Sequence, residues 1–287
     1  MSNVSTKTAT YLLEIGCEEI PARFVPGFLE QLRQAIETAF KDQRIGFKSV
    51  QAFATYRRLV ILVNDCDAKQ ADLAEELAGP PINIAFDDKK NPLPPAIGFA
   101  KRVGIDVTQL STKTINGKDV VVGLKSEKGR PLKEILPELI PTLLTQLKLP
   151  IGMRWGSESQ SFIRPIHWIV SLYGDKVVPF TAYGVKADRY TFGHRFLTEA
   201  SSKKEVSTGI KLSLKTPKDF FSTLEKKGKV ICDSQKRQAI ISAYLKKAKQ
   251  TDVDPELLDE VTYLVEYPTP LTCSFDKKYL DIPAPVL

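Results

Sequence analysis

The chain has 287 residues, 43% hydrophobic and 26% charged, which is enough apolar material to form a folded core. Its 41 Lys and Arg residues outnumber its 34 Asp and Glu residues, giving a net charge of +7. These values exclude a disordered chain and a disulfide-stapled miniprotein. No apolar run approaches the roughly 20 residues of a membrane-spanning helix, and the polar start carries no secretory signal. We therefore expect a cytoplasmic protein without a membrane partner.

The cysteines and histidines limit the possible metal chemistry. The four cysteines are widely scattered and form no C-x-x-C pair, so we predict free thiols, buried or half-buried, rather than structural zinc (Cys17, Cys66, Cys232, Cys273). The only histidines are His167 and His194, too few for a multi-histidine metal site. We expect no bound metal.

The first segment predicts a strand, a helix and a second strand. Thr10–Ile15 is apolar and predicts a strand, with a turn through Gly16 and Pro21 after it. Apolar residues recur at helical spacing over Val25–Asp42 and predict an amphipathic helix. Arg58–Val63 is a β-branched run that predicts a buried strand. We take residues 1–78 as an N-terminal α+β module.

The next segment is rich in proline. Gly79–Pro95 is expected to form extended loop, because proline fixes φ and lacks an amide donor. Asp119–Gly123 predicts a strand after the hairpin turn Asn116–Gly117. Lys133–Leu149 has helical spacing but two prolines, which predicts two short helical pieces or a kinked one. Residues 79–149 are therefore expected to be a Pro-rich connection with a hairpin and helices.

The remaining chain changes from aromatic strands to basic helices. His167–Tyr173 and Val177–Tyr183 flank a Gly-Asp turn and predict a β-hairpin. Gln235–Gln250 predicts a helix with a basic face, which completes a β-rich and then basic helical module over residues 150–250. Asp254 and Pro255 predict an N-cap and first helical residue. Residues 251–287 are expected to give a helix and a strand that lead into further domains.

Positive charge is concentrated in one block. Lys186–Gln250 holds 16 Lys and Arg residues against 6 Asp and Glu residues, a net charge of +10, so the rest of the chain carries −3. Such a block favours a polyanion such as nucleic acid. A lysine-rich solvated face that binds nothing explains the same charges, and the sequence leaves both interpretations open.

Two charged pairs lie beside predicted strands. Glu18 and Glu19 follow the first strand and have the chemistry of paired carboxylates for acid–base catalysis, or of a turn that binds a partner. Arg57 and Arg58 precede a strand, either as an exposed edge pair or as a phosphate or carboxylate contact. No glycine-rich phosphate loop is present, so these pairs have no nucleotide motif beside them.

Arginine and aromatic residues cluster in three segments. They are Met153–Gly156, Phe162–His167 and Gly193–Phe196. Arginines beside aromatic rings can hold backbone phosphates and stack on bases. The alternative is an aromatic core with arginines extending to its rim.

These segments resemble one protein family. The signature begins with Tyr-Leu-Leu-Glu-Ile-Gly-Cys-Glu-Glu-Ile-Pro at residues 11–21. It continues in family order through further segments (Phe53–Leu59, Gly79–Pro81, Met153–Gly156, Phe162–His167, Gly174–Pro179, Gly193–Phe196, Leu264–Pro268, Phe275–Pro283). Together they resemble the β subunit of bacterial heterotetrameric glycyl-tRNA synthetase, with this chain as an N-terminal fragment. Cys17 replaces the usual Thr, and Ser201–Phe221 matches poorly.

The resemblance implies a role that composition does not reveal. In that family the α subunit activates glycine with ATP and Mg, and the β subunit binds tRNA(Gly) within an α2β2 assembly. It implies a multi-domain α+β fold of mixed sheets with packed helices, part of it similar to the B3/B4-type module of phenylalanyl-tRNA synthetase. This chain would then be the tRNA-binding and subunit-assembly portion of an aminoacyl-tRNA synthetase, with no catalytic residue or cofactor of its own.

The candidate site residues follow from both lines of reasoning. The RNA-binding candidates are basic or aromatic (Arg154, Trp155, Arg164, His194, Arg195, Lys203, Lys204). The subunit or interdomain docking candidates are the two charged pairs (Glu18, Glu19, Arg57, Arg58). Two alternatives stay open. One is an editing-type hydrolase acting on mischarged tRNA through His194 or Glu18 and Glu19; the other is an interaction module that does not contact RNA.

Overall fold

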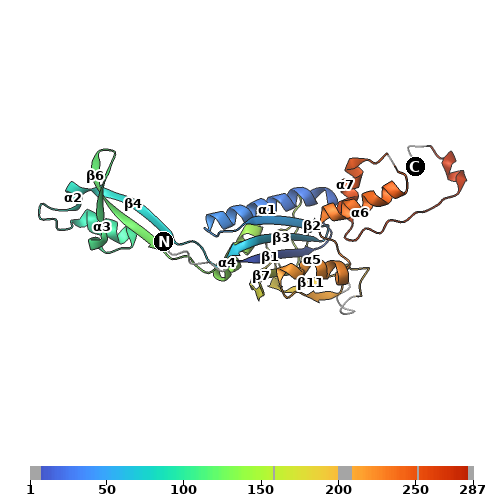
Figure 1. Ribbon diagram of the computed structural model, residues 1–287, viewed down its shortest axis with the longest axis horizontal. Helices are drawn as coiled ribbons and strands as arrows, with labels where there is room; N and C mark the ends of the chain where they lie inside the picture. The colour runs from blue at the N-terminus through green and yellow to red at the C-terminus, as the bar shows by residue number, and fades with distance from the viewer. Residues whose placement is uncertain (1–7, 158, 200–208, 251, 284–287) are drawn as a thin grey trace.

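The computed structural model describes residues 8–157, 159–199, 209–250 and 252–283. Three parts follow one another along the longest axis (Figure 1). A central body is built around a large sheet. A small lobe, residues 73–127, projects from one end of the body and is called the arm. A pair of helices, residues 234–264, lies at the other end and is called the helical end.

The elements up to the end of the arm are β1 (Thr8–Cys17), η1 (Ala22–Phe24), α1 (Val25–Asp42), β2 (Ser49–Thr55), β3 (Arg58–Asp67), β4 (Leu73–Pro81), α2 (Ile82–Ala85), α3 (Pro94–Val103), η2 (Val107–Gln109), β5 (Ser111–Ile115) and β6 (Lys118–Glu127). The later elements are α4 (Leu132–Gln146), β7 (Ile166–Tyr173), β8 (Lys176–Val177), β9 (Thr181–Ala182), β10 (Val185–Asp188), β11 (Tyr190–Phe192), β12 (Lys211–Ser213), η3 (Pro217–Asp219), α5 (Phe220–Thr223), η4 (Leu224–Gly228), α6 (Ser234–Lys247), α7 (Pro255–Leu264) and η5 (Lys277–Asp281). The mixture confirms the predicted α+β class.

The body sheet has seven strands, in the order β2-β3-β1-β7-β10-β9 with β8 added beside β7. Strand β1 is central and pairs antiparallel with both β3 and β7. Because residues alternate between the two faces of a strand and both faces are covered here, β1 reads as a nearly continuous apolar run. Its one charged residue in that run, Glu14, is completely buried.

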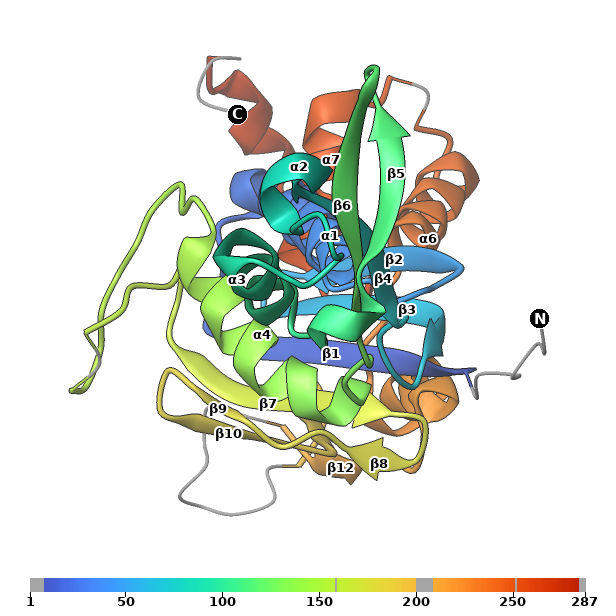
Figure 2. The same ribbon diagram turned by 90° about the vertical axis from the view of Figure 1, so that its left-hand side faces the viewer.

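Different layers cover the two faces of the sheet. Helices α1 and α4 pack on one face, where alternate residues of β1 such as Leu13 join Phe28 and Leu136 in the main hydrophobic core. On the other face Leu12 and Trp168 form a second core with Phe220 and Leu224, from the segment that follows β12. Figure 2 shows α4 lying across the sheet. Hydrophobic packing on both faces of the sheet therefore fixes the positions of β1 and β7.

Gly16 is required for the packing at the end of β1. A Cβ atom at this position would lie 1.8 Å from Cε2 of Trp168, far inside the contact distance. The Trp168 indole therefore lies directly against the backbone of β1. Glycine at this place in the signature has a steric reason, because any side chain would displace the indole.

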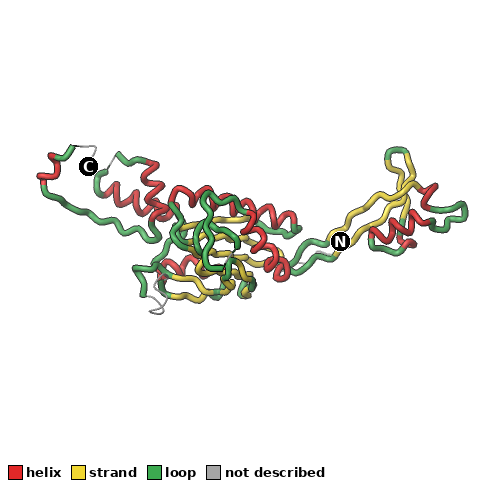
Figure 3. The backbone as a smooth tube through the Cα atoms, turned by 180° about the vertical axis from the view of Figure 1, so that it is seen from behind, coloured by secondary structure: helices red, strands yellow, loops and turns green. Residues whose placement is uncertain are grey.

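The arm is a separate two-layer unit. Its three strands, in the order β4-β6-β5, carry α2 and α3 on one face, and Figure 3 shows it as a lobe apart from the body. Its own core contains Ala96, Phe99, Val103 and Val121. The arm joins the body through two neighbouring segments, residues 68–72 and 128–131, which we call the stalk.

The predicted elements of the body and the helical end were largely confirmed. The predicted helix Val25–Asp42 is α1, with the same bounds. The strands predicted at Thr10 and Arg58 are β1 and β3, and the Asn116–Gly117 turn joins β5 to β6. Asp254 caps α7, because its carboxylate accepts hydrogen bonds from the amides of Glu256 and Leu257.

The prediction of extended loop over Gly79–Pro95 was wrong at both ends of the stretch, whereas residues 86–93 lie outside the helices and strands. Gly79–Pro81 ends strand β4, which lies at the edge of the arm sheet and has an irregular register before Pro81. Pro94 begins helix α3. Both places tolerate proline, since an edge strand and the first turn of a helix leave its missing amide donor unneeded.

For Lys133–Leu149 the structure excludes the two short helical pieces and leaves a single helix, and the predicted hairpin after β7 needs correction. Helix α4 is continuous from Leu132 to Gln146 with both prolines inside it. Burial of its apolar side, including Leu136 and Leu144, offsets the hydrogen bonds that these prolines cannot donate. The hairpin after β7 is shorter than predicted, because only β8 pairs with β7, whereas β9 pairs with β10.

The packing divides the chain elsewhere than at residues 78, 149 and 250. Residues 8–67 share one sheet with residues 166–188, so the predicted first and third modules form a single body. The predicted connection contains both the arm and α4, and α4 belongs to the body core. The sequence suggested separate modules because the two strands that pair with β1, β3 and β7, are separated by about a hundred residues of chain.

The cysteines largely follow the prediction. Cys17, Cys66 and Cys232 are buried free thiols, and burial raises the pKa of each to about 12. Cys273 is exposed, which corrects the prediction for that residue. Among the helices in the described part of the chain, none combines the length and apolar character needed to cross a membrane.

Candidate functional site

Several predicted site residues meet where β1 ends. The loop after β1 carries Glu18 and Glu19, and it lies between the segment that precedes β7 and the turn that follows β11. The amide of Glu18 donates to the carbonyl of Pro165 at 2.9 Å, and the amide of Ile20 donates to the carbonyl of Tyr56. The loop is therefore held by the backbone on two sides. The two carboxylates of this loop and the three basic side chains that contact the loop form what we call the surface cluster (Glu18, Glu19, Arg164, His167, Arg195).

Glu18 pairs with His167. Its Oε1 atom lies 2.5 Å from Nε2 of His167, and both side chains are about 30% exposed, at 29% and 30%. Burial favours the neutral acid, but the hydrogen bond and charge of His167 outweigh it and lower the pKa of Glu18. A carboxylate that orients an imidazole is a common arrangement for proton transfer.

Glu19 pairs with the predicted RNA-binding residue Arg195. Nη1 of Arg195 lies 2.6 Å from Oε1 of Glu19, and its guanidinium also lies 4.5 Å from the ring centroid of Phe196. Arg164 also contacts the loop after β1, since its Nε donates to the backbone carbonyl of Glu19 at 2.8 Å. The docking candidate Glu19 is thus brought together with the RNA-binding candidates Arg164 and Arg195, and its carboxylate offsets the charge of Arg195.

His194 has a structural role in this geometry. Its Nδ1 atom accepts the backbone amides of Phe196 and Leu197, both at 3.2 Å. The ring proton of the neutral form must then sit on Nε2, which leaves no free acceptor for a general base. Burial lowers the pKa of His194 and so favours this neutral form.

Arg154 and Trp155 lie on the long loop between α4 and β7. Arg154 is exposed. The Trp155 ring stacks on Tyr183 with centroids 5.7 Å apart and an interplanar angle of 22°. A backbone bridge between Met153 and Phe162 closes the loop. Arg154 is consequently a solvent-facing cation on an anchored loop, whereas Trp155 serves as part of the anchor.

A second group of charges lies inside the protein. Arg58 is completely buried between two buried carboxylates, with Nη1 3.1 Å from Glu14 and Nε 2.9 Å from Glu266. Thr191 donates to Glu14 at 2.9 Å, and Thr55 donates to Glu266 at 2.6 Å. We call these five residues the buried cluster. Because Glu266 follows α7, the cluster ties the helical end to the body.

The two buried carboxylates differ in their protonation energetics. At Glu14 burial raises the pKa by more than Arg58 and Thr191 lower it. At Glu266 burial also raises the pKa, but the charge of Arg58 and the hydrogen bonds from Thr55 and Arg58 prevail and lower it. Arg58 therefore sustains the ionised form of Glu266 more effectively than that of Glu14.

The remaining predicted residues have other positions. Arg57 and Arg58 have no exposed surface, so neither the exposed edge pair nor a contact to another subunit fits them. Arg58 does contact carboxylates, but these belong to the same chain. Lys203 and Lys204 lie outside the described residues.

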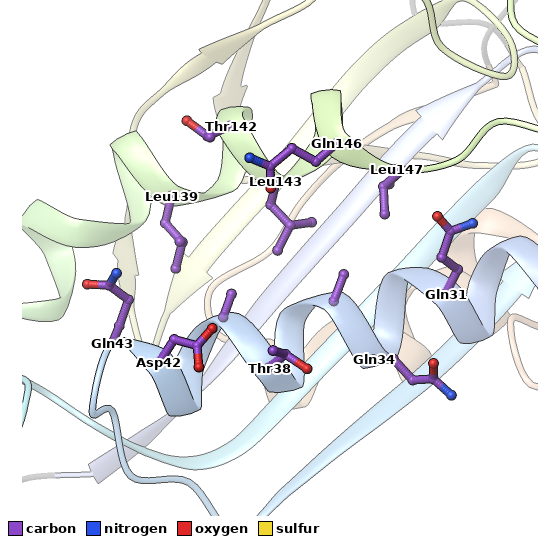
Figure 4. A pocket seen from close by; sticks show the side chains of 12 residues that line it. Gln31, Gln34, Thr38, Asp42, Gln43, Leu139, Thr142, Leu143, Gln146 and Leu147 are labelled. Atoms are coloured by element: carbon purple, nitrogen blue, oxygen red, sulfur yellow. The ribbon is translucent and has the colours of Figure 1, made fainter.

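A groove of about 570 Å³ lies between α1 and α4 (Figure 4). Its floor is apolar, with Leu139 and Leu143, and its rim carries amides and hydroxyls such as Gln34 and Thr142. No Lys or Arg side chain is among its lining residues. The groove therefore offers no positive charge to a polyanion, and the Asp42 carboxylate in its lining would repel one. Across the described ranges, no group of three or more His, Cys, Asp or Glu side chains is placed to hold a metal ion.

Comparison with known proteins explains the signature segments. A sequence model of the family described as "Glycyl-tRNA synthetase beta subunit" matches residues 11–287. The chain belongs to this family. Proteins named glycine--tRNA ligase beta subunit from Shouchella clausii and Desulforudis audaxviator are 39% and 38% identical to it over 282 and 284 residues. These alignments cover 96% and 97% of this chain, but 39% and 40% of the relatives, so the chain spans about two-fifths of their length.

The glycyl-tRNA synthetase beta subunit signature contains residues that sequence reasoning did not select. Glu14, His167 and Glu266 all lie within the matched segments, yet none was among the candidate site residues. A signal was present for Glu14, because a lone carboxylate within an apolar strand must be paired if it is buried. Nothing in the local sequence pointed from Arg58 to Glu266, since their contact joins residues 208 positions apart.

Proposed function

We propose that this chain is the tRNA-binding and subunit-assembly portion of a glycine--tRNA ligase. Membership of the glycyl-tRNA synthetase beta subunit family over residues 11–287 carries the proposal. In it, an alpha subunit binds ATP and Mg and attaches glycine to tRNA(Gly) within an α2β2 assembly in the cytoplasm. The body would be the part similar to the B3/B4-type module of phenylalanyl-tRNA synthetase.

The surface near the loop that precedes β7 supports a contact to RNA. Arg154 is an exposed cation beside the half-buried ring of Trp155, and Phe196 exposes 73% of its surface next to Arg195. Exposed aromatic rings beside arginine provide both stacking and phosphate contacts. Glu19 competes with phosphate for Arg195, so we assign the primary phosphate contact to Arg154.

The test measures tRNA affinity as a function of salt for the chain and for Arg154→Ala. Each neutralised phosphate in single-stranded RNA contributes a slope of about −0.7 to log K against log salt. Arg154→Ala should weaken binding and reduce the magnitude of that slope by about one contact. The matched control is Arg33→Ala on α1, whose guanidinium pairs with Glu30 and Glu37. Equal losses for both variants, or binding independent of salt, would contradict a defined RNA surface.

A second experiment tests the proposal that the alpha subunit activates glycine and that this chain alone does not. The chain alone should not support glycine-dependent exchange between ATP and pyrophosphate, because it has no phosphate-loop motif. Adding the alpha subunit should restore exchange and yield a complex that elutes as one species. Exchange by the chain alone, in a preparation free of alpha subunit, would contradict the proposal.

The Glu18–His167 pair supports one alternative, an editing-type hydrolase. The 2.5 Å contact would let Glu18 orient His167 to activate a water molecule toward the ester of a mischarged tRNA. His194 supports this function less, because both of its backbone contacts occupy Nδ1. Deacylation of mischarged tRNA by the chain, and its loss in His167→Ala, would favour the hydrolase. Absence of deacylation leaves the scaffold proposal as the better account.

A further inference from the structure

The helical end buries polar residues and exposes apolar ones. Among the described residues of α6 and α7, the only buried side chains are those of Arg237 and Thr262. Apart from Tyr263, no apolar side chain of these helices joins the hydrophobic cores of the body or the arm. Leu257 and Leu264 expose 58% and 52% of their surface. Helices of 14 and 10 residues depend on packing for most of their stability, so their apolar side calls for a cover.

Two buried charges fasten the base of this helix pair. Nε of Arg237 donates to the carbonyl of Thr262 at 2.9 Å, and its Nη1 donates to the carbonyl of Ile231 at 2.7 Å. Glu266, just after α7, pairs with Arg58 of the body. Figure 1 shows both helices extending past the body sheet. The start of α6 and the end of α7 are therefore fixed by polar contacts, and the outer half of the pair projects beyond them.

The outer half carries a groove of about 350 Å³ between the two helices. Six of its nine lining residues are apolar (Ile241, Leu245, Gln250, Asp252, Val253, Asp254, Leu257, Leu258, Val261). The charged lining residues are Asp252 and Asp254, and the carboxylate of Asp254 is engaged in capping α7. A groove of this composition disfavours a polyanion and suits apolar side chains of a polypeptide.

Further apolar residues are exposed where the chain leaves the helical end. Of the fourteen large hydrophobic side chains that the described residues expose, five lie within residues 252–283 (Leu257, Leu264, Leu271, Phe275, Tyr279). The hydroxyl of Tyr244 on α6 forms a hydrogen bond with the hydroxyl of Thr272, so the segment after α7 leaves from the side of α6. Exposed apolar surface is thus concentrated beside the groove and along the segment that departs from it.

The relatives contain a long polypeptide that begins at this place. The chain corresponds to the N-terminal 39% and 40% of the two relatives, so about three-fifths of each follows the matched part. A segment joined through the backbone is held near the groove at a high effective concentration, whereas a separate molecule must first encounter it. Covalent continuity therefore favours the following part of the same subunit over the alpha subunit or a second copy of this chain.

We propose that the groove between α6 and α7 is the docking site for the part of the beta subunit that follows the matched residues in the family. An apolar side chain of that part lies against Leu245, Leu257 and Val261. Arg237 and Glu266 hold the helix pair in the direction that presents this groove. The helical end is then a layer between the body and the rest of the subunit. The inference rests on membership of the family and does not require tRNA binding.

The test joins this chain to the remaining part of the Shouchella clausii protein, and we call the product the fusion. Hydrogen exchange of the backbone amides is followed by mass spectrometry in the chain alone and in the fusion. We expect the amides of α6 and α7 to exchange at least about tenfold more slowly in the fusion, because burial of one leucine suffices for a change of that size. Strands β1 and β7 should exchange equally in both, which shows that the shared body is folded alike.

Two variants of the fusion locate the contact. Leu257→Gln changes a residue that lines the groove, and Leu264→Gln makes the same change on the same helix outside it. Both leucines are exposed in the chain alone and glutamine keeps a good helix propensity, so neither change should unfold the helices. We expect Leu257→Gln to lose most of the added protection and Leu264→Gln to keep it. Equal loss or equal retention in the two variants would contradict docking at the groove.

The full-length Shouchella clausii protein excludes a faulty junction as an explanation. Its residues aligned with α6 and α7 should exchange more slowly than in its own truncation at the position aligned with Leu287. Fast exchange of these helices in both the fusion and the full-length relative would overturn the proposal. The proposal is also wrong if the helices gain protection only when the alpha subunit is added, or only at concentrations where sedimentation shows a dimer of this chain.

Discussion

The buried cluster and the surface cluster use the same residue types only a few positions apart, yet they differ in what they can do. Glu14 lies in β1 and faces Arg58 without solvent, whereas Glu19 lies in the following loop and pairs with the half-exposed Arg195. Water screens the second pair and not the first. The comparison shows that the buried charges hold the body and helical end together, while the surface charges are free to exchange partners.

The largest expected effect comes from removing the central charge of the buried cluster. Arg58→Met would leave Glu14 and Glu266 buried without a counter-ion, and we expect a loss of about 3–5 kcal/mol in the free energy of unfolding. Urea denaturation followed by circular dichroism would measure it. Arg33→Met on the surface of α1 is the control and should change stability by less than about 1 kcal/mol. Similar losses in the two variants would mean that burial does not distinguish these ion pairs.

A substitution at Gly16 tests the packing of Trp168, whose indole lies against Gly16 between the buried cluster and the surface cluster. Trp168 and His167 are neighbours on β7, and strand alternation sends the indole inward toward Arg58 and the imidazole outward toward Glu18. Gly16→Ala would push against the indole, and we expect a loss of about 2–3 kcal/mol. Gly27→Ala is the matched control, because a Cβ atom at Gly27 meets no atom within 4 Å. Thermal unfolding of both variants would show whether the indole can move aside.

The two carboxylates of the buried cluster should respond differently to neutralisation. We expect Glu266→Gln to cost about 1–2 kcal/mol at pH 7, because the ionised form is the one that Arg58 and Thr55 stabilise. Glu14→Gln should cost less, because burial already raises the pKa of Glu14 and disfavours its charge. Equal losses from the two variants would contradict the difference in their environments.

The same difference predicts a pH dependence. The pKa of Glu266 is lower in the folded chain than in the unfolded chain, so its contribution is present above its unfolded value of about 4.3 and is lost as the pH falls through the folded value. Glu14 has the opposite sign, since its raised pKa gives a contribution that is lost as the pH rises through the folded value. Stability measured between about pH 5 and pH 2 should therefore fall less steeply in Glu266→Gln than in the parent. An unchanged slope would remove Glu266 as an acid-sensitive group.

The smallest expected effect on stability belongs to the surface cluster. Glu19→Gln should change the free energy of unfolding by no more than about 1 kcal/mol, and less at high salt. Under the proposed function it should also strengthen tRNA binding, because Arg195 would lose its competing carboxylate. A filter-binding titration of both chains against tRNA checks this, with Glu30→Gln on α1 as the control. Weaker binding by Glu19→Gln would mean that the loop, rather than its charge, matters for RNA.

The spacing of apolar residues predicted α1 correctly, because the buried residues of that helix lie close together in the sequence. Helix α1 shows its buried side at Phe28, Leu32 and Ile36, and the predicted bounds hold. The prolines of the arm and of α4 misled the prediction, because the favourable positions of proline depend on where helices and sheet edges begin. That information lies in the pairing of β4 with β6 and in the packing of α4 on the body core.

The candidate site was predictable in part. The residues around Glu18 and Arg195 were identified, but their mutual pairing was not. The loops that carry them meet only because β1 pairs with β7 and β11 packs beside β7. For Arg58 the sequence left open an exposed edge pair and a phosphate or carboxylate contact, and its complete burial between two carboxylates was not predicted. A basic pair before a strand carries no sign of burial by itself, and the carboxylates that make burial possible come from residues 14 and 266.

The position of β1 also has a consequence for folding during synthesis. Tyr11 pairs with Val63 on one side and with Tyr173 on the other. Strand β1 therefore cannot complete its pairing until β7 has been synthesised, 162 residues after Tyr11. Contacts of such long sequence separation slow folding, and an unpaired apolar strand edge is prone to aggregation. The arm, by contrast, closes within 55 residues and can fold while the ribosome is still making β7. The nascent chain therefore acquires its outermost part before the middle of its sheet is complete.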